Sequence, residues 1–230
     1  MIPIFDLDDT LYFEHSYVVS GFTAVASMLE KKHGLPKDES KNKMLQFLSA
    51  FGRGRVFNYI LKENGILSKA TLNNCIFVYR HHKPKISLNL SVLKILQNFN
   101  QRSYLVTDGH KIVQKNKINS LNLKPLFKKI YITHNYGLKY SKPSTFCFNL
   151  IRKNETCLWT DMFYVGDNPR KDFVNLNPLG VHTIRVLTGE YSELVAKKGY
   201  DAKYKIKNLS ELFKIIDKIE KDRKLNVSNK

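Results

Sequence analysis

Apolar positions along the chain follow two patterns, one typical of buried strands and one typical of helices. Short continuous apolar runs predict strands at residues 2–5, 103–107, 129–133, 162–165, 183–187 and 204–206. Helical spacing predicts helices at 92–99, 111–120, 144–152 and 210–219, with a short helical segment near Asp172. Strands that alternate with helices imply parallel pairing through right-handed crossovers. We therefore predict an α/β fold, a parallel sheet core with helices on both faces.

The stretch from residue 15 to residue 83 has helical periodicity and no strand pattern. Four helices are expected there, at 14–33, 37–51, 56–62 and 68–79. The pattern predicts a core domain of residues 1–14 and 84–222, into which residues 15–83 are inserted as an all-helical domain. Residues 223–230 are polar and basic, and we expect a frayed tail.

Three carboxylates follow the first predicted strand, at Asp6, Asp8 and Asp9. Uncompensated buried carboxylates repel one another and lose hydration. A hard cation resolves that conflict, because magnesium takes oxygen ligands from one or two carboxylates together with a substrate phosphate. The alternative is an acidic turn after a strand, with Asp9 as a capping residue. This segment favours a magnesium-dependent site that handles phosphate.

Further polar groups stand after other predicted strands or in loops, at Thr107, Lys142, Asp167 and Asp172. In an open parallel sheet, ligands bind outside the carboxyl ends of the strands. Each residue has a plain structural explanation, since threonine and aspartate are common in turns and lysine is common on surfaces. Their joint occurrence at strand ends is what indicates a site.

Together these segments resemble the four motifs of the haloacid dehalogenase-like hydrolases, in order and over nearly the whole chain. The first is Asp6-Leu-Asp-Asp-Thr-Leu11, which matches D-x-D-x-T-L except that Asp9 stands where many members have glycine. The second is the strand that ends at Thr107, and the third is Lys142. The fourth is Gly166-Asp-Asn-Pro-Arg-Lys-Asp172, of the form G-D-x-x-x-x-D. The resemblance implies a Rossmann-like core, and the helical insertion is similar to the α-helical cap found between motifs one and two.

The resemblance implies a role for each motif residue. Asp6 would be the nucleophile that forms an aspartyl-phosphate, and Asp8 the general acid and then the base that activates water. Mg²⁺ would be held by Asp6, Asp167 and the backbone carbonyl of Asp8. The phosphoryl group would be bound by Thr107, the Asp108 amide and Lys142, with Asp172 supporting Lys142 or a metal-bound water.

The second acid separates branches of the family. A halide leaving group needs no proton, so Asp8 argues for phosphoester chemistry rather than dehalogenation. The resemblance implies a phosphatase of a small phosphorylated metabolite, either a sugar phosphate or a nucleoside monophosphate. A phosphomutase of the same family is the alternative, because that branch keeps both acids.

Two arginines in the inserted helical domain are candidate substrate contacts. Arg53 and Arg55 lie in a Gly-Arg-Gly-Arg loop between two predicted helices. Glycines permit close backbone approach, and the guanidinium groups suit an anionic substrate. The alternative is a helix-breaking loop with solvated arginines.

The charge and the cysteine content limit which ligands and which cellular compartment we expect for the protein. The formal net charge is +18, which suits anionic ligands and also raises the alternative of a nucleic-acid-associated protein with a secondary hydrolase activity. No zinc-finger, helix-turn-helix or RNA-binding signature accompanies the charge, so we expect a small anionic substrate and no specific nucleic acid. The chain shows no export signal or membrane-spanning run, and its three cysteines form no C-x-x-C pair. We expect a cytoplasmic protein; the oligomeric state stays open.

Overall fold

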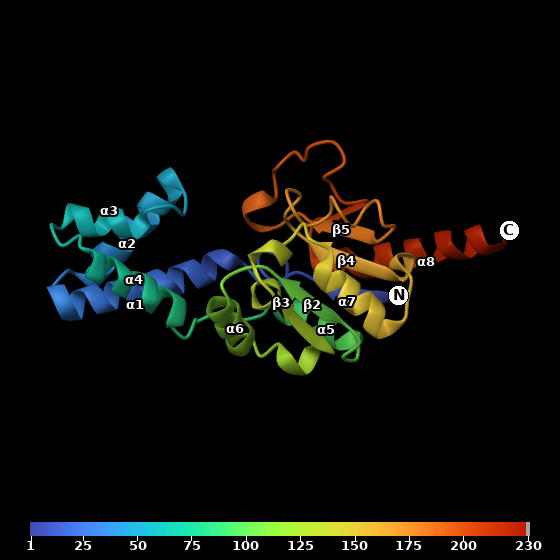
Figure 1. Ribbon diagram of the computed structural model, residues 1–230, viewed down its shortest axis with the longest axis horizontal. Coiled ribbons are helices and arrows are strands. Elements are labelled where there is room, and N and C mark those ends of the chain that lie inside the picture. Colours follow the sequence, from blue (N-terminus) through green and yellow to red (C-terminus); the bar gives the residue numbers. More distant parts are fainter. Residues whose placement is uncertain (229–230) are drawn as a thin grey trace. The chain divides into compact units, whose positions relative to one another are not determined.

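A computed structural model describes residues 1–228, and six parallel strands form one sheet in it (Figure 1). The strands lie in the order β3-β2-β1-β4-β5-β6. Their bounds are β1 Ile2–Phe5, β2 Tyr104–Thr107, β3 Lys129–Ile132, β4 Met162–Gly166, β5 His182–Val186 and β6 Tyr204–Ile206. The first strand is central, pairing with β2 on one side and β4 on the other. The predicted α/β fold with a parallel sheet is confirmed.

Alternate residues of β1 pack on opposite faces of the sheet. Ile4 belongs to a core with Tyr104 and Tyr164, its neighbours in register, and with Phe148 of helix α7 (Phe146–Glu155). The ring of Phe5 lies 5.7 Å from that of Phe99, which ends helix α5 (Leu90–Asn98). Because both faces are covered, the strand is apolar throughout rather than alternating.

Two further helices are α6 (Lys111–Ser120) and α8 (Leu212–Ser228). Two predictions need correction. Residues 223–228 continue α8, so they are not a frayed tail; residues 229–230 lie outside the described residues. No helix forms near Asp172, where turns and bends run from Pro169 to Gly180. Short 3₁₀ turns occur at Lys124–Leu126, Thr133–Asn135, Leu138–Tyr140, Trp159–Asp161, Gly189–Tyr191 and Leu209–Glu211.

The helical stretch folds as α1 (Glu14–His33), α2 (Lys37–Phe51), α3 (Val56–Glu63) and α4 (Lys69–His81). The chain as a whole forms two compact units. The sheet unit holds residues 1–14, 87–114 and 121–230, and the helical unit holds residues 15–86 and 115–120. The helical unit has its own core, in which Val25, Leu29 and Met44 are fully buried.

Among the described residues, no helix is long and apolar enough to cross a membrane.

Candidate active site

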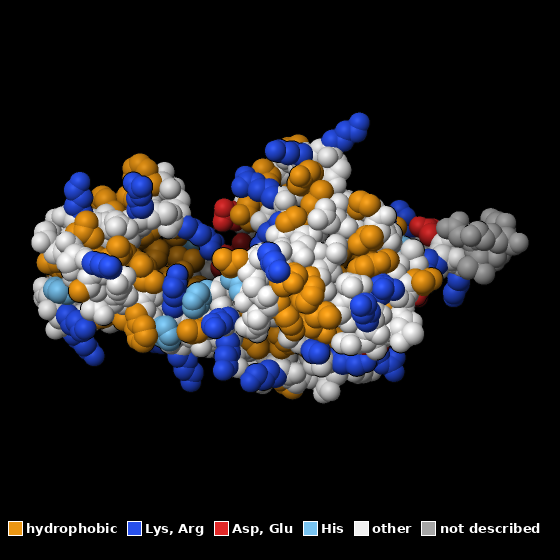
Figure 2. All heavy atoms as spheres, in the orientation of Figure 1, with side chains coloured by type: hydrophobic (Ala, Val, Ile, Leu, Met, Phe, Trp, Pro, Cys, Tyr) orange, Lys and Arg blue, Asp and Glu red, His pale blue; other side chains and the backbone are white. Residues whose placement is uncertain are grey.

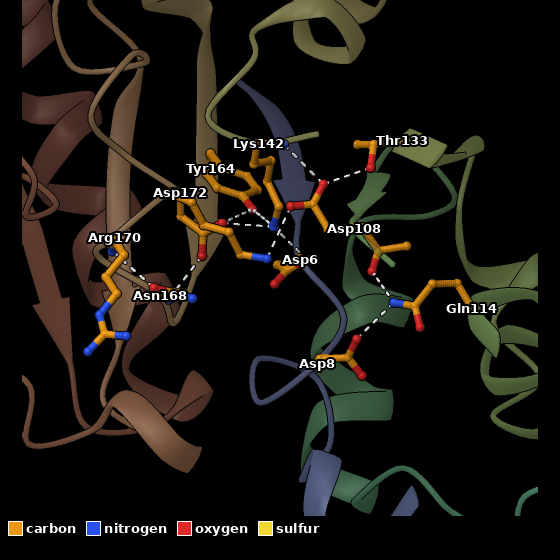
Figure 3. Close-up of polar contacts among 12 residues, drawn as sticks. Asp6, Asp8, Asp108, Gln114, Thr133, Lys142, Tyr164, Asn168, Arg170 and Asp172 are labelled. Carbon is orange, nitrogen blue, oxygen red and sulfur yellow. Dashed lines mark hydrogen bonds and ion pairs between the residues drawn. The ribbon is translucent and has the colours of Figure 1, made fainter. Parts of the chain in front are cut away.

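Asp6 lies one residue beyond β1, at the carboxyl edge of the sheet. Its backbone N–H donates to the Val165 carbonyl at 2.9 Å, so the ladder with β4 continues and holds the residue in place. The side chain is buried, and its Oδ1 lies 2.9 Å from Lys142 Nζ (Figure 3). Burial raises the pKa of Asp6 to about 7, although the Lys142 charge acts against the rise. The chain therefore places an acid of unusual proton affinity beside a cation.

Lys142 bridges two carboxylates. Its Nζ lies 2.7 Å from Asp172 Oδ1 as well as 2.9 Å from Asp6, and it donates to the Tyr164 hydroxyl at 2.9 Å. Burial alone would lower the pKa of Lys142, but Asp172 and Asp6 raise it well above its ordinary value. The lysine therefore stays charged although almost no solvent reaches it.

Hydrogen bonds from backbone N–H groups to side chains of the same loop hold the loop after β4 in shape. Asn168 Oδ1 accepts the Arg170 N–H at 2.9 Å, and the Asn168 N–H donates to Asp172 Oδ2 at 2.9 Å. A Cβ on Gly166 would lie 2.6 Å from Asp172 Oδ2, so only glycine lets the Asp172 carboxylate approach the strand end. The Gly-Asp-Asn-Pro-Arg-Lys-Asp motif thus packs Asp172 against Lys142.

Three buried carboxylates, those of Asp6, Asp167 and Asp172, offer oxygen atoms that lie within 4.8 Å of one another. Burial raises the pKa of Asp167 to about 9, and the negative charges of Asp172 and Asp6 add to the rise. Such crowding is unfavourable for carboxylates alone and suits a hard divalent cation with oxygen ligands. The donor set therefore fits magnesium. The side chain of Asp8 is outside this group, and metal binding through the Asp8 carbonyl stays a prediction.

Asp8 occupies a different environment. Because β1 ends at Phe5, Asp8 lies beyond the strand. The alternation of side chains along a strand therefore does not determine the direction of the Asp8 side chain. Its Oδ1 accepts the Tyr12 hydroxyl at 2.6 Å, and its Oδ2 accepts Gln114 Nε2 at 2.8 Å (Figure 3). Gln114 Nε2 also lies 2.6 Å from Thr107 Oγ1, so one amide connects the second acid to the end of β2.

The Asp108 side chain joins three loops. Its Oδ1 accepts the Thr133 hydroxyl at 2.7 Å and the Lys142 backbone N–H at 3.1 Å, and its Oδ2 lies 3.1 Å from Lys171 Nζ. Burial works against the charge, yet Lys142 and Lys171 lower the pKa of Asp108 below its usual value. The carboxylate is therefore a structural anchor, distinct from the Asp108 amide that the sequence suggested for phosphate.

Asp9 does more than fill a turn. It adopts φ 52°, the left-handed conformation that glycine accepts most readily, while its buried carboxylate accepts the N–H groups of Glu14 at 2.8 Å and Glu190 at 3.3 Å. Its carbonyl accepts the Thr188 hydroxyl. A Cβ on Gly189 would lie 2.1 Å from Asp9 Cγ, so the glycine makes room for this contact. Through these hydrogen bonds Asp9 connects the turn that follows β1 to the loop that follows β5.

Sequence reasoning missed five side chains that contact the motif residues: Tyr12, Tyr164, Gln114, Thr133 and Lys171. The sequence predicts Tyr164 only as part of a buried strand, and its ring does pack in the core. Lys171 adjoins a motif aspartate and was therefore findable. No local signal distinguishes Gln114 or Thr133 from other polar residues.

Arg53 and Arg55 lie in the helical unit, in the loop between α2 and α3. They line a cavity of about 340 Å³ together with aromatic residues that include Phe22, Phe57 and Tyr79. The cavity lies inside the helical unit, and its participation in substrate binding stays a prediction.

The family model for haloacid dehalogenase-like hydrolases matches residues 3–186. The chain belongs to this family. It is 28% identical to the glyceraldehyde 3-phosphate phosphatase of Methanocaldococcus jannaschii, over 95% of this chain and 98% of that protein. It is 26% identical to the glyceraldehyde 3-phosphate phosphatase of Pyrococcus furiosus, over 94% and 93% of the two chains. This member of the haloacid dehalogenase-like hydrolases is accordingly a hydrolase of phosphoric monoesters.

The fold is shared with solved structures of the family. A haloacid dehalogenase-like hydrolase of Bacillus subtilis, crystallised with magnesium, superimposes with a TM-score of 0.61. The match covers 93% of this chain and 97% of that one at 18% identity. At that identity the similarity supports the arrangement of strands and helices.

Proposed function

We propose that this protein is a magnesium-dependent phosphatase of a small sugar phosphate, and that it works through a phosphorylated Asp6. The observation that carries the proposal is the Lys142 ammonium held between Asp6 and Asp172, beside the carboxylate of Asp167. This arrangement supplies a nucleophile, a cation for phosphoryl oxygens and a metal site at one strand end.

In the first step, an Asp6 oxygen attacks phosphorus while the bond from phosphorus to the leaving oxygen breaks. Lys142 lowers the charge that accumulates on the phosphoryl oxygens, and it is charged because two carboxylates surround it. Thr107 Oγ1 and the Asp108 amide are the other expected phosphoryl contacts, at the end of β2.

Asp8 gives a proton to the leaving oxygen and then takes one from the water that hydrolyses the aspartyl-phosphate. Tyr12 and Gln114 fix the direction of its carboxyl group from two sides.

Magnesium would be held by Asp6, Asp167 and the Asp8 carbonyl, where it would reduce the repulsion between a carboxylate nucleophile and a phosphate dianion. The raised pKa values of Asp6 and Asp167 support a cation at this place, since the metal-free cluster binds protons instead. The family relative from Bacillus subtilis was solved with magnesium.

A three-carbon aldehyde phosphate is the substrate that we infer, because curated relatives matched over nearly their full length act on glyceraldehyde 3-phosphate. Nucleoside monophosphates are the second class that the sequence suggested. Lys and Arg side chains are spread over the visible face of the protein rather than gathered in one patch (Figure 2). We therefore propose no specific nucleic-acid partner. We also propose that the enzyme is cytoplasmic.

The test is a screen of phosphorylated metabolites with magnesium, measured by release of inorganic phosphate. The panel includes glyceraldehyde 3-phosphate, hexose phosphates and nucleoside monophosphates, each run in parallel with the Asp6→Asn variant and with chelator. We expect magnesium-dependent turnover to be most efficient for glyceraldehyde 3-phosphate. Equal kcat/KM across the panel would contradict the substrate, and undiminished turnover by Asp6→Asn would contradict the mechanism.

A mutase would leave a different product. Incubation of a hexose 1-phosphate that yields hexose 6-phosphate without net phosphate release would favour that alternative.

A further inference from the structure

A cavity of about 470 Å³ lies within the sheet unit, beside the turn that follows β1. Residues 9–13 of the turn form one part of it, and Val186 and Thr188 after β5 form another. The beginnings of α5 and of the 3₁₀ turn that precedes α8 complete the lining. Asp6, Lys142 and Asp167 are not among the lining residues, so the cavity is separate from the proposed phosphoryl site.

The polar lining is almost entirely uncharged. Hydroxyl and amide side chains predominate: Thr10, Ser87, Asn89, Ser91, Thr188, Asn208 and Ser210. Of the residues that the structure describes, no lysine or arginine lines the cavity, although the chain has 38 of them. Asp9 is the one carboxylate in that described lining, and both of its oxygens accept backbone N–H groups. A phosphate or carboxylate would find no cation in this lining, which therefore selects a neutral ligand.

Two amide side chains frame the cavity. Asn89 Oδ1 accepts the Ser91 N–H at the beginning of α5, and Asn208 Oδ1 accepts the Ser210 N–H, both at 3.0 Å. Because the carbonyl ends of these amides serve as helix caps, their NH₂ ends are the groups that suit ligand oxygen atoms.

The remaining wall is apolar, formed by Leu11, Leu88, Val92, Val186 and Leu209. The volume falls within the range of small-molecule sites. We propose that this cavity binds a neutral, hydroxyl-bearing small molecule with one apolar face, of the size of a nucleoside or an aryl glycoside. Its hydroxyls would meet the asparagine amides, and its apolar face would lie on the leucine and valine side chains.

Isothermal titration calorimetry on the full chain tests the proposal, with magnesium and excess inorganic phosphate present to occupy the phosphoryl site. The neutral probes are adenosine, uridine and phenyl β-glucoside, and each is paired with its monophosphate. We expect saturable one-to-one binding of at least one neutral probe, with the paired phosphate at least about tenfold weaker because its charge lacks a counterion.

Three variants locate the binding. Ser91→Phe fills the cavity mouth and is expected to abolish binding, while Lys94→Phe, on an exposed position of α5 outside the lining, keeps the parent affinity. Val92→Trp replaces Ser91→Phe if circular dichroism shows that the latter is unfolded.

Several results would overturn the proposal: no neutral probe saturates the protein, the monophosphates bind as tightly as their neutral partners, or filling the cavity leaves the affinity unchanged.

Discussion

Asp6 and Asp8 are two residues apart, yet their carboxyl groups lie in opposite kinds of surroundings. Asp6 is buried and faces the charge of Lys142 at 2.9 Å. Asp8 is half-buried and accepts hydrogen bonds from Tyr12 and Gln114, which carry no charge. A nucleophile has to be ionised and supported by cations, whereas an acid–base group has to exchange a proton during each turnover. One short turn provides both environments.

The two regions also differ in what happens when a partner is lost. Around Asp6 the carboxylates and Lys142 form one buried electrostatic unit, so removing a member leaves an uncompensated charge. Around Asp8 the two partners named above are neutral side chains, so removing one costs a hydrogen bond of about 1 kcal/mol. We therefore expect steep effects on the first side and graded effects on the second.

The largest effect is expected for Asp6→Asn. An amide of the same shape cannot attack phosphorus, so kcat should fall by roughly 10³-fold or more. Acid-quenched reactions with ³²P-labelled substrate should show phosphoprotein in the parent and none in the variant. Labelled protein at the parent level in Asp6→Asn would assign the nucleophile elsewhere.

Asp8→Asn should lower kcat by about 10²- to 10⁴-fold for a sugar phosphate, because the leaving alkoxide then lacks its proton donor. The loss should be smaller with p-nitrophenyl phosphate, whose leaving group is stable as an anion. Since water activation is impaired as well, the aspartyl-phosphate should accumulate with that substrate. An equal loss on both substrates, with no trapped phosphoenzyme, would contradict the acid–base role.

Asp167→Asn should separate function from stability. The pKa of Asp167 is raised to about 9, so in the metal-free protein its carboxyl stabilises the fold while protonated, and that contribution is lost as the pH rises from about 4 through about 9. At pH 9 the free energy of unfolding of the variant should therefore exceed that of the parent by roughly 1–2 kcal/mol, and its unfolding temperature should be higher. At pH 5 the difference should be smaller. Differential scanning calorimetry without magnesium measures the stability of the metal-free proteins, and the same scan with magnesium measures how much the metal stabilises each of them.

Magnesium should raise the midpoint of the parent and have much less effect on Asp167→Asn, because a neutral amide is a weaker ligand. If Asp167→Asn is less stable than the metal-free parent at pH 9, repulsion between the three carboxylates does not destabilise the parent. A variant with unchanged magnesium stabilisation would remove Asp167 from the metal site.

The sequence anticipated the motif residues and missed most of their partners, for a physical reason. Asp6 and Thr107 stand directly at strand ends, and parallel strands bring such ends to one edge of the sheet. Tyr164 has the pattern of a core residue because its ring is buried with Phe148, while its hydroxyl accepts a hydrogen bond from Lys142. Gln114 contacts Asp8 across 106 positions of sequence, a pairing that tertiary packing alone decides.

Local structure is predicted best where hydrophobic periodicity is strong. The bounds of α2, α6 and β6 agree with the pattern. The pattern around Asp172 predicts a helical segment, and Phe173 and Leu176 do point into the core. Its backbone nevertheless folds as turns that keep only scattered helix-type bonds, such as Asp172 N–H to the Asn168 carbonyl, while the Asn168 and Asn177 side chains bond to Arg170 and Asp201.

The smallest effect, and the finest test of the comparison, is expected for Gln114. Gln114→Met keeps the length of the side chain but removes the amide that joins Asp8 to Thr107, so Asp8 would keep only its Tyr12 contact among those described above. We expect kcat to fall about tenfold with little change in KM, because substrate binding does not depend on the direction of Asp8. Gln114→Glu is the matched control: its carboxylate repels Asp8, so its pH–rate profile should shift, whereas that of Gln114→Met should keep its shape. If both variants instead raise KM and leave kcat intact, Gln114 serves the phosphoryl site through Thr107 rather than the acid, and the separation between the two aspartates is less complete than their contacts indicate.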